Sequence, residues 1–183
     1  MGKYDIDTYL EFVKPLYDSK DPAHNFQHIE RIIERSGAIR ENVESNIRLE
    51  LLYFLTSFHG LGKKLHLDEY AQKMSRDFLV GIGWYEDEIE FGFECLRRHA
   101  KKPVEVEERI VHDANHIELL GAFGIAKAFT TGGALGQTYE ETIRIYEEDY
   151  LDKVEFQTAI GRRLAEEGRK YAKDFLTRLK SEL

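Results

Sequence analysis

Seven histidines are the most chemically suggestive residues of this sequence, and four of them form two pairs with i,i+4 spacing. The pairs are His24 with His28 and His112 with His116. On a helix, this spacing places both imidazoles on one face, where they could bind one metal ion. The same spacing also arises by chance between ordinary surface or half-buried histidines, so the pairs leave both interpretations open.

His59 differs from the other histidines because it ends a strongly apolar segment, residues 47–58. A polar group at the floor of a helical bundle needs a partner, which favours a functional role. Lys63 and Lys64 follow it and form either a solvated basic tip or a clamp for phosphate at the mouth of a pocket. The basic segment 97–102, which contains His99, is predicted to extend this basic rim.

The segment 112–116 offers a second metal interpretation, because it has the two-histidine spacing of the zinc metalloprotease helix, H-E-x-x-H. The shorter Asp113 stands where that motif has its glutamate, and no third ligand is evident. This interpretation is therefore disfavoured.

The elements that position these residues are predicted to be helices, about eight in number. Apolar residues recur at steps of three or four, and there are only 3 prolines. The predicted helices span about 7–17, 26–39, 47–58, 68–79, 86–99, 103–121, 139–150 and 154–183. Asn46 is expected to cap the third of them, and glycines are expected to make a loop at 59–62 and a turn at 130–133.

The last predicted helix carries an apolar face that we expect to point inward. Its residues are Phe156, Ile160, Leu164, Tyr171, Phe175 and Leu179.

Composition predicts one all-α domain over residues 1–183 in a reducing compartment. The 183 residues are 42% apolar, and a single cysteine cannot form an internal disulfide. The start of the chain has no apolar signal segment, and no apolar run approaches the roughly 20 residues that span a bilayer. The net charge of −8 disfavours nucleic acid as a partner. We therefore expect a cytoplasmic protein without a membrane or nucleic-acid partner.

Four ordered fragments resemble the stand-alone HD-domain hydrolases, which are all-helical bundles. They are AHNFQHIERI (23–32), FHGLGKK (58–64), VHDANHIELLGAFGIAKAFTTGG (111–133) and TAIGRRLAEEGRKYAKDF (158–175). The family carries a histidine in an H-x-x-H-x-x-R-like segment, a His-Asp doublet after a buried helix and a distal Asp. The resemblance therefore implies a single HD-type helical bundle and a metal-dependent phosphohydrolase.

Carried over residue by residue, the resemblance implies that His28 and His59 are metal ligands, with His24 beside the first. The aspartate of the doublet falls on Gly60, so that carboxylate is missing. The distal metal aspartate falls on Asn115, and Asp113 is the alternative if the register shifts.

The resemblance and the basic pair at 63–64 together give the other candidate residues of the site. They are His59, Lys63 and Asp113 as catalytic groups and His24, Lys63, Lys64 and His99 as groups that bind substrate.

In an intact site, two carboxylates balance the charge of a cation that lowers the pKa of its bound water. Two imidazoles and an amide would bind magnesium poorly, but could hold zinc, nickel, iron or manganese if another carboxylate joined them. The leading hypothesis is thus a phosphohydrolase of a small phosphorylated molecule or nucleotide with a weakened or altered metal site.

Two alternatives to this hypothesis stay open. One is a catalytically inactive HD fold that binds a phosphorylated ligand or a partner protein. The other is a structural dimer module, and a homo-oligomer is compatible with each hypothesis.

Overall fold

The computed structural model describes residues 2–18 and 25–183, and all regular secondary structure in that part of the chain is helical. The prediction of an all-α protein is therefore confirmed. The chain divides into two compact units, Met1–His112 and Asp113–Leu183, which we call unit 1 and unit 2. That residues 1–183 act as a single domain stays a prediction.

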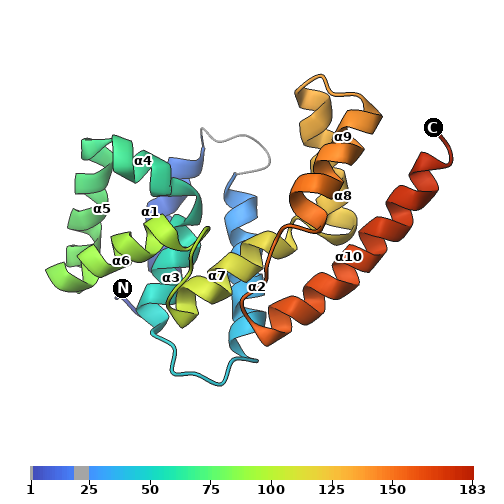
Figure 1. The fold of residues 1–183 in the computed structure, drawn as a ribbon. Helices are drawn as coiled ribbons and strands as arrows, with labels where there is room; N and C mark the ends of the chain where they lie inside the picture. The colour runs from blue at the N-terminus through green and yellow to red at the C-terminus, as the bar shows by residue number, and fades with distance from the viewer. Residues whose placement is uncertain (1, 19–24) are drawn as a thin grey trace. The chain divides into compact units, whose positions relative to one another are not determined.

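The helices are labelled in Figure 1. Unit 1 contains α1 (Ile6–Tyr17), α2 (Phe26–Arg40), α3 (Leu49–Phe58), α4 (Gly62–Leu67), α5 (Glu69–Gly81) and α6 (Glu86–Arg98). The division between the units falls within α7 (Val106–Ile117). Unit 2 continues with α8 (Gly121–Ala134), α9 (Tyr139–Tyr146) and α10 (Ala159–Lys180). A 3-10 turn (His59–Leu61) links α3 to α4, and a π-helical turn (Glu147–Leu151) follows α9.

The core of unit 1 is built around α3, which packs against α1, α2 and α6. Its side chains from Leu51 to Phe58 are buried except for the half-buried Tyr53. The ring of Phe54 lies 4.7 Å from that of Phe58 and 5.5 Å from that of Trp84, measured between centroids. The prediction that this apolar segment forms a buried central helix is therefore confirmed.

The start of α3 differs from the expectation that Asn46 caps it. The residue preceding the helix is Arg48, and its backbone N–H donates to Oε1 of Glu107 at 2.7 Å. The Arg48 guanidinium also donates to the Glu107 carboxylate, at 2.9 Å. Because Glu107 is fully buried, a contact across 59 residues of sequence fixes this helix end, and no local cap is needed.

The first glycine-rich segment, 59–62, is helical instead of forming the expected loop. Neither Gly60 nor Gly62 has a positive φ, and the chain passes from α3 through the 3-10 turn directly into α4. A Cβ on Gly60 would come 3.0 Å from the Tyr17 ring, so this glycine allows a close approach.

The second glycine-rich segment, 130–133, lies inside α8, so the predicted turn is wrong. A Cβ on Gly132 would collide with the hydroxyl of Thr142, and Gly132 therefore lets α8 and α9 pack closely. The helices α4 and α8 are the two that the sequence did not predict, and the glycines that allow a close approach are Gly60, just before α4, and Gly132 within α8.

Unit 2 has its own core, to which α10 contributes small residues. The buried cluster includes Ala165, Ala172 and Leu176 together with Leu120 and Tyr146. Figure 1 shows α10 running beside α8, as their packing requires.

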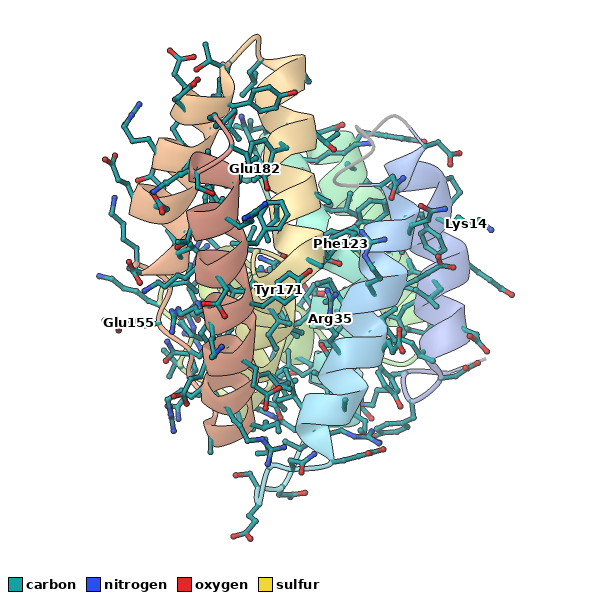
Figure 2. All side chains as sticks on the ribbon, turned by 90° about the vertical axis from the view of Figure 1, so that its right-hand side faces the viewer. Lys14, Arg35, Phe123, Glu155, Tyr171 and Glu182 are labelled. Atoms are coloured by element: carbon teal, nitrogen blue, oxygen red, sulfur yellow. The ribbon has the colours of Figure 1, made fainter. Side chains whose placement is uncertain are left out.

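The outer face of α10 corrects the expectation that Tyr171 and Phe175 point inward. Tyr171, labelled in Figure 2, is 53% exposed, and Phe175 is 40% exposed. The buried face of the helix consists of Gly161, Ala165, Ala172 and Leu176. Three of these four residues are small, and small side chains allow a closer approach to neighbouring helices than aromatic ones.

In the described part of the chain, no helix combines the length and the hydrophobicity that crossing a membrane requires.

Candidate functional site

His28 and His59 lie next to one another in unit 1. His28 is in the first turn of α2, where Asn25 caps the helix by accepting from the His28 backbone N–H at 3.3 Å. His59 follows the last residue of α3. The two imidazole rings meet at 61°, with their centroids 5.6 Å apart. The structure thus brings together the two histidines that the resemblance assigns to one ligand, and their metal role stays a prediction.

A third histidine, His99, is hydrogen-bonded to His59. Its Nε2 lies 2.8 Å from Nδ1 of His59, and its Nδ1 lies 2.6 Å from the carbonyl oxygen of Leu96. A carbonyl oxygen can only accept, so Nδ1 of His99 carries a proton. Burial lowers the pKa of His99, and its side chain is neutral at pH 7 with a bare Nε2.

The tautomer of His59 follows from this chain of hydrogen bonds. Because Nε2 of His99 accepts, Nδ1 of His59 must donate. In the neutral ring of His59 the lone pair is therefore on Nε2, and in the protonated ring Nε2 becomes a donor. The hydrogen bond to His99 therefore holds the His59 ring in one orientation.

The role of His99 changes as a result. We expected it to contact substrate, but it is only 3% exposed and both of its ring nitrogens are used. His99 holds the His59 ring through this hydrogen bond, and its role in binding substrate stays a prediction. The sequence pointed to His99 through its basic neighbours, whereas its real partners lie 40 residues upstream and on the preceding helical turn.

His112 also belongs to unit 1, on α7, and is 6% exposed. Its charge is one of the influences that lower the pKa of His99, after burial, so the two rings are close enough to interact electrostatically. His116 is on the same helix, which confirms the helical placement of the i,i+4 pair. His24, the remaining predicted member of the site, lies outside the described residues.

Tyr17 is a residue of the site that the sequence did not single out. It ends α1, is 1% exposed, and donates its hydroxyl to the Ser57 carbonyl at 3.0 Å. The same hydroxyl accepts from the Gly60 backbone N–H at 3.1 Å. In the sequence Tyr17 is one of the apolar residues of α1, and only its phenolic oxygen hinted at a polar partner.

Unpaired cations flank the site. Neither Lys63 nor Lys64 forms an ion pair with any residue in the ranges 2–18 and 25–183, and Lys63 is exposed. Arg98, by contrast, is committed to the buried carboxylate of Glu108 through bonds of 2.9 Å from Nε and Nη2. Of the predicted basic rim, Lys63 and Lys64 are therefore without an ion pair among the described residues, whereas Arg98 holds α6 to the start of α7.

The residues of unit 1 do not fit the divalent cation that the HD resemblance implies. No group of three or more His, Cys, Asp or Glu side chains that could hold a metal occurs among the described residues. Gly60 has no side chain, and Tyr17 occupies the space beside it. Two neutral imidazoles without a carboxylate do not balance the charge of a hard cation such as manganese or magnesium.

Asp113, in unit 2, holds the start of α10. Its carboxylate accepts from the Gln157 N–H at 2.9 and 3.1 Å, from the Thr158 N–H at 2.7 Å and from the Thr158 hydroxyl at 2.8 Å. Thr158 in turn caps α10 by accepting from the Gly161 N–H at 2.9 Å. This network gives Asp113 a structural role. Its role as a ligand or catalytic group, and that of Asn115 as a ligand, stay predictions.

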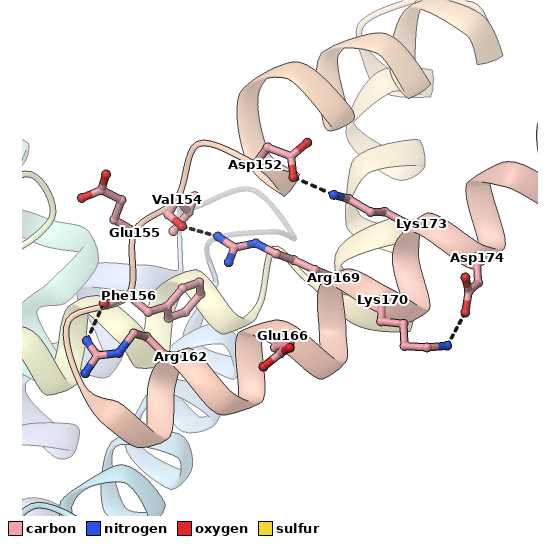
Figure 3. A pocket seen from close by; sticks show the side chains of 10 residues that line it. All are labelled: Asp152, Val154, Glu155, Phe156, Arg162, Glu166, Arg169, Lys170, Lys173 and Asp174. Atoms are coloured by element: carbon pink, nitrogen blue, oxygen red, sulfur yellow. Dashed lines mark hydrogen bonds and ion pairs between the residues drawn. The ribbon is translucent and has the colours of Figure 1, made fainter.

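A cavity of about 850 Å³ in unit 2, drawn in Figure 3, is an alternative candidate for binding an anion. The cations that line it are Arg162, Arg169, Lys170 and Lys173. Arg169 donates to the carbonyls of Leu151, at 2.6 Å, and Val154. Lys170 and Lys173 form ion pairs of 2.8 Å with Asp174 and Asp152. These cations are occupied by partners within unit 2, which makes the cavity a weaker anion site than the lysines beside His59.

Comparison with known proteins shows similarity to a curated bacterial protein. No family model matches the sequence. The uncharacterized protein YpgQ of Bacillus subtilis (strain 168) is 23% identical over 187 residues, and the match covers 94% of this chain and 90% of YpgQ.

Solved structures show the same fold over the whole chain. A Listeria innocua protein matches with a TM-score of 0.79 at 22% identity, covering 100% of this chain and 97% of the other. YpgQ in complex with ADP matches with a TM-score of 0.79 at 20% identity, covering 97% and 94%. An HD-superfamily hydrolase of Bacillus thuringiensis matches with a TM-score of 0.76 at 22% identity, covering 97% and 95%. The chain therefore has the HD-domain fold.

Proposed function

We propose that unit 1 binds a small phosphorylated molecule, specifically a nucleotide, at the site of His28 and His59. In this proposal the metal-dependent hydrolysis associated with HD hydrolases is weakened or altered. The observation that carries it is the hydrogen bond between His59 and His99, which holds Nε2 of His59 in a fixed direction in a site with no carboxylate at position 60.

The charges around His59 favour an anion. Protonated His59 can donate from Nε2 to a phosphate oxygen, and Lys63 follows one helical turn later with no ion-pair partner among the described residues. A carboxylate at position 60 would repel a phosphate, and Gly60 removes that repulsion.

The relatives support a nucleotide in particular. YpgQ has been crystallised with ADP, so one protein of this fold accommodates a nucleoside diphosphate. At 20% identity that match establishes the fold, and the ligand is carried to this chain as part of the proposal.

Calorimetry with ADP in the presence of EDTA tests the proposal. We expect the parent protein to bind, and His59→Ala and the double variant Lys63→Ala/Lys64→Ala each to weaken binding by about tenfold or more, because each removes a charge-assisted hydrogen bond. The matched control is Lys170→Ala, which removes a lysine already paired with Asp174 in unit 2. Absence of binding with and without metal would favour the structural dimer module.

The second candidate is a working phosphohydrolase with an altered metal set. It is favoured by the two adjacent imidazoles, which suit zinc, nickel or iron better than magnesium or manganese. In that case Lys63 would steady the charge that develops on the phosphate. Release of phosphate from ADP, assayed with zinc, nickel, iron and manganese in turn, tests this candidate. Binding of ADP that disappears with EDTA would favour it over the first.

Other features of the proposal concern partners and location. The net charge of −8 argues against nucleic acid, and we propose a cytoplasmic protein that uses neither nucleic acid nor membrane. A homo-oligomer is compatible with this function and is tested by light scattering.

A further inference from the structure

The contact between Tyr17 and Gly60 ties three elements of unit 1 together at the floor of the histidine site. Tyr17 ends α1, Gly60 lies in the 3-10 turn after α3, and the ring of Tyr17 is 6.4 Å from that of Phe26, the first residue of α2. His59 and His28 are thus each within two residues of a partner of Tyr17. A change at Tyr17 therefore acts on the immediate support of both histidines.

The Tyr17 ring occupies the space that any side chain at position 60 needs. A Cβ built on Gly60 lies 3.0 Å from Cε1, 3.3 Å from the hydroxyl oxygen and 3.6 Å from Cζ of Tyr17. The first two separations are tighter than normal carbon contacts, so the ring must shift even for alanine. The Tyr17 ring cannot shift freely, because its hydroxyl is hydrogen-bonded to both the Ser57 carbonyl and the Gly60 backbone N–H.

We propose that the Tyr17 ring excludes any side chain from position 60, and with it the carboxylate that the His28–His59 site would need to take a hard divalent cation. This rests on the proposed function, which makes the ligand a phosphate-bearing anion. Gly60 leaves the site without a carboxylate at this position, and the Tyr17 ring prevents an aspartate from fitting there. With the ring removed, an aspartate at position 60 fits and the site takes a hard divalent cation.

The phenol suits this role because it fills volume without bringing charge. It satisfies the Ser57 carbonyl and the Gly60 N–H at the helix end, groups that would otherwise need water or another partner. Burial raises the pKa of the Tyr17 hydroxyl, so the group stays neutral across the physiological range. A carboxylate in the same space would instead place a buried negative charge next to the two histidines.

Manganese binding by engineered variants tests the proposal. We compare Gly60→Asp, Gly60→Asp/Tyr17→Phe and Gly60→Asp/Tyr17→Leu by calorimetry with MnCl₂. The phenylalanine variant keeps the ring and loses the hydroxyl, whereas the leucine variant loses the ring. We expect the leucine double variant to bind manganese at least about tenfold more tightly than the other two, the range that a single supporting group contributes to metal affinity.

Two results of the manganese titrations would overturn the proposal. One is manganese affinity in Gly60→Asp equal to that of the leucine double variant, which would mean that the ring does not control the position. The other is no manganese binding by any variant, which would mean that position 60 does not face a cation site.

A packing control works without any ligand. Gly60→Ala should lower the melting temperature in the parent background and have a smaller effect in Tyr17→Leu, because the leucine leaves room for the methyl group. Additive effects of the two changes would contradict the proposed steric pairing and overturn the proposal.

The proposed function is separated from this inference by ADP binding of the parent protein in EDTA. Loss of that binding alongside the expected manganese pattern refutes the nucleotide function and leaves Tyr17 as the residue that excludes a cation.

Discussion

Units 1 and 2 both place cations and carboxylates near helix ends, but they use them differently. In unit 2 the carboxylate of Asp113 is surrounded by donors at the start of α10, and the cavity lysines have acidic partners. In unit 1 the position expected to carry a carboxylate is Gly60, and Lys63 has no ion-pair partner among the residues described. The comparison teaches that paired charges in this chain hold helices in place, whereas Lys63 has no such structural task among the described residues.

The largest effect expected from this comparison is the loss of Asp113. Asp113→Ala leaves the amides of Gln157 and Thr158 and the Thr158 hydroxyl without their acceptor, and we expect the free energy of unfolding to fall by about 3 kcal/mol. Urea denaturation measures it.

The control for this prediction is Asp174→Ala, which removes an exposed carboxylate paired with Lys170 and should change stability by less than about 0.5 kcal/mol. If Asp113→Ala leaves stability intact and changes only metal binding, Asp113 is a ligand and the structural role assigned to it is wrong.

Neighbouring glycines of α8 provide the next test. Gly132→Ala drives a methyl group into Thr142, and we expect it to destabilise the protein by about 2 kcal/mol. Gly133 lies on the same helix, but a methyl group there would have no atom within 4 Å. Gly133→Ala should therefore stabilise the protein by up to about 1 kcal/mol. Thermal unfolding measures both, and equal effects would show that α8 and α9 do not need the small residue between them.

A smaller effect is expected at alkaline pH from Tyr146 in unit 2. Burial raises the pKa of its hydroxyl, which donates to the Leu119 carbonyl, to about 12. The stabilisation is fully present below the unfolded pKa of about 10 and is lost as the pH rises toward 12.

Between pH 9 and pH 11, the parent protein should therefore lose about 0.5–1 kcal/mol more unfolding free energy than Tyr146→Phe, allowing for screening near the hydroxyl. Urea denaturation at both pH values measures the difference. Tyr139→Phe, which removes an exposed hydroxyl, is the control and should keep the parent's pH dependence.

The smallest stability effects are expected at the lysines. Lys63→Ala and Lys170→Ala should each leave the unfolding free energy almost unchanged, because both side chains are exposed. Only Lys63→Ala should weaken ADP binding. Equal ADP affinities in the two variants would remove the distinction between paired and unpaired cations on which the comparison rests.

Several features of the molecule were determined by sequence alone. The apolar periodicity placed most helices to within a few residues of their observed bounds, because burial of one helical face is a local property of the pattern. Residues 51–58 are apolar around most of the helix circumference, which indicated that α3 is the core helix. The ordered fragments around His28, His59 and residues 111–133 indicated the HD fold, which the solved structures confirm.

Only the tertiary structure decided what the glycines and the histidines do. Gly60 and Gly132 looked like loop residues, and whether a glycine makes a turn or admits a neighbour depends on Tyr17 or Thr142, which the pattern around the glycine does not contain. The tautomer of His59 depends likewise on His99, 40 residues away. Helix periodicity is set by neighbours within one turn, whereas close contacts and hydrogen-bond direction are set by residues that only folding brings together.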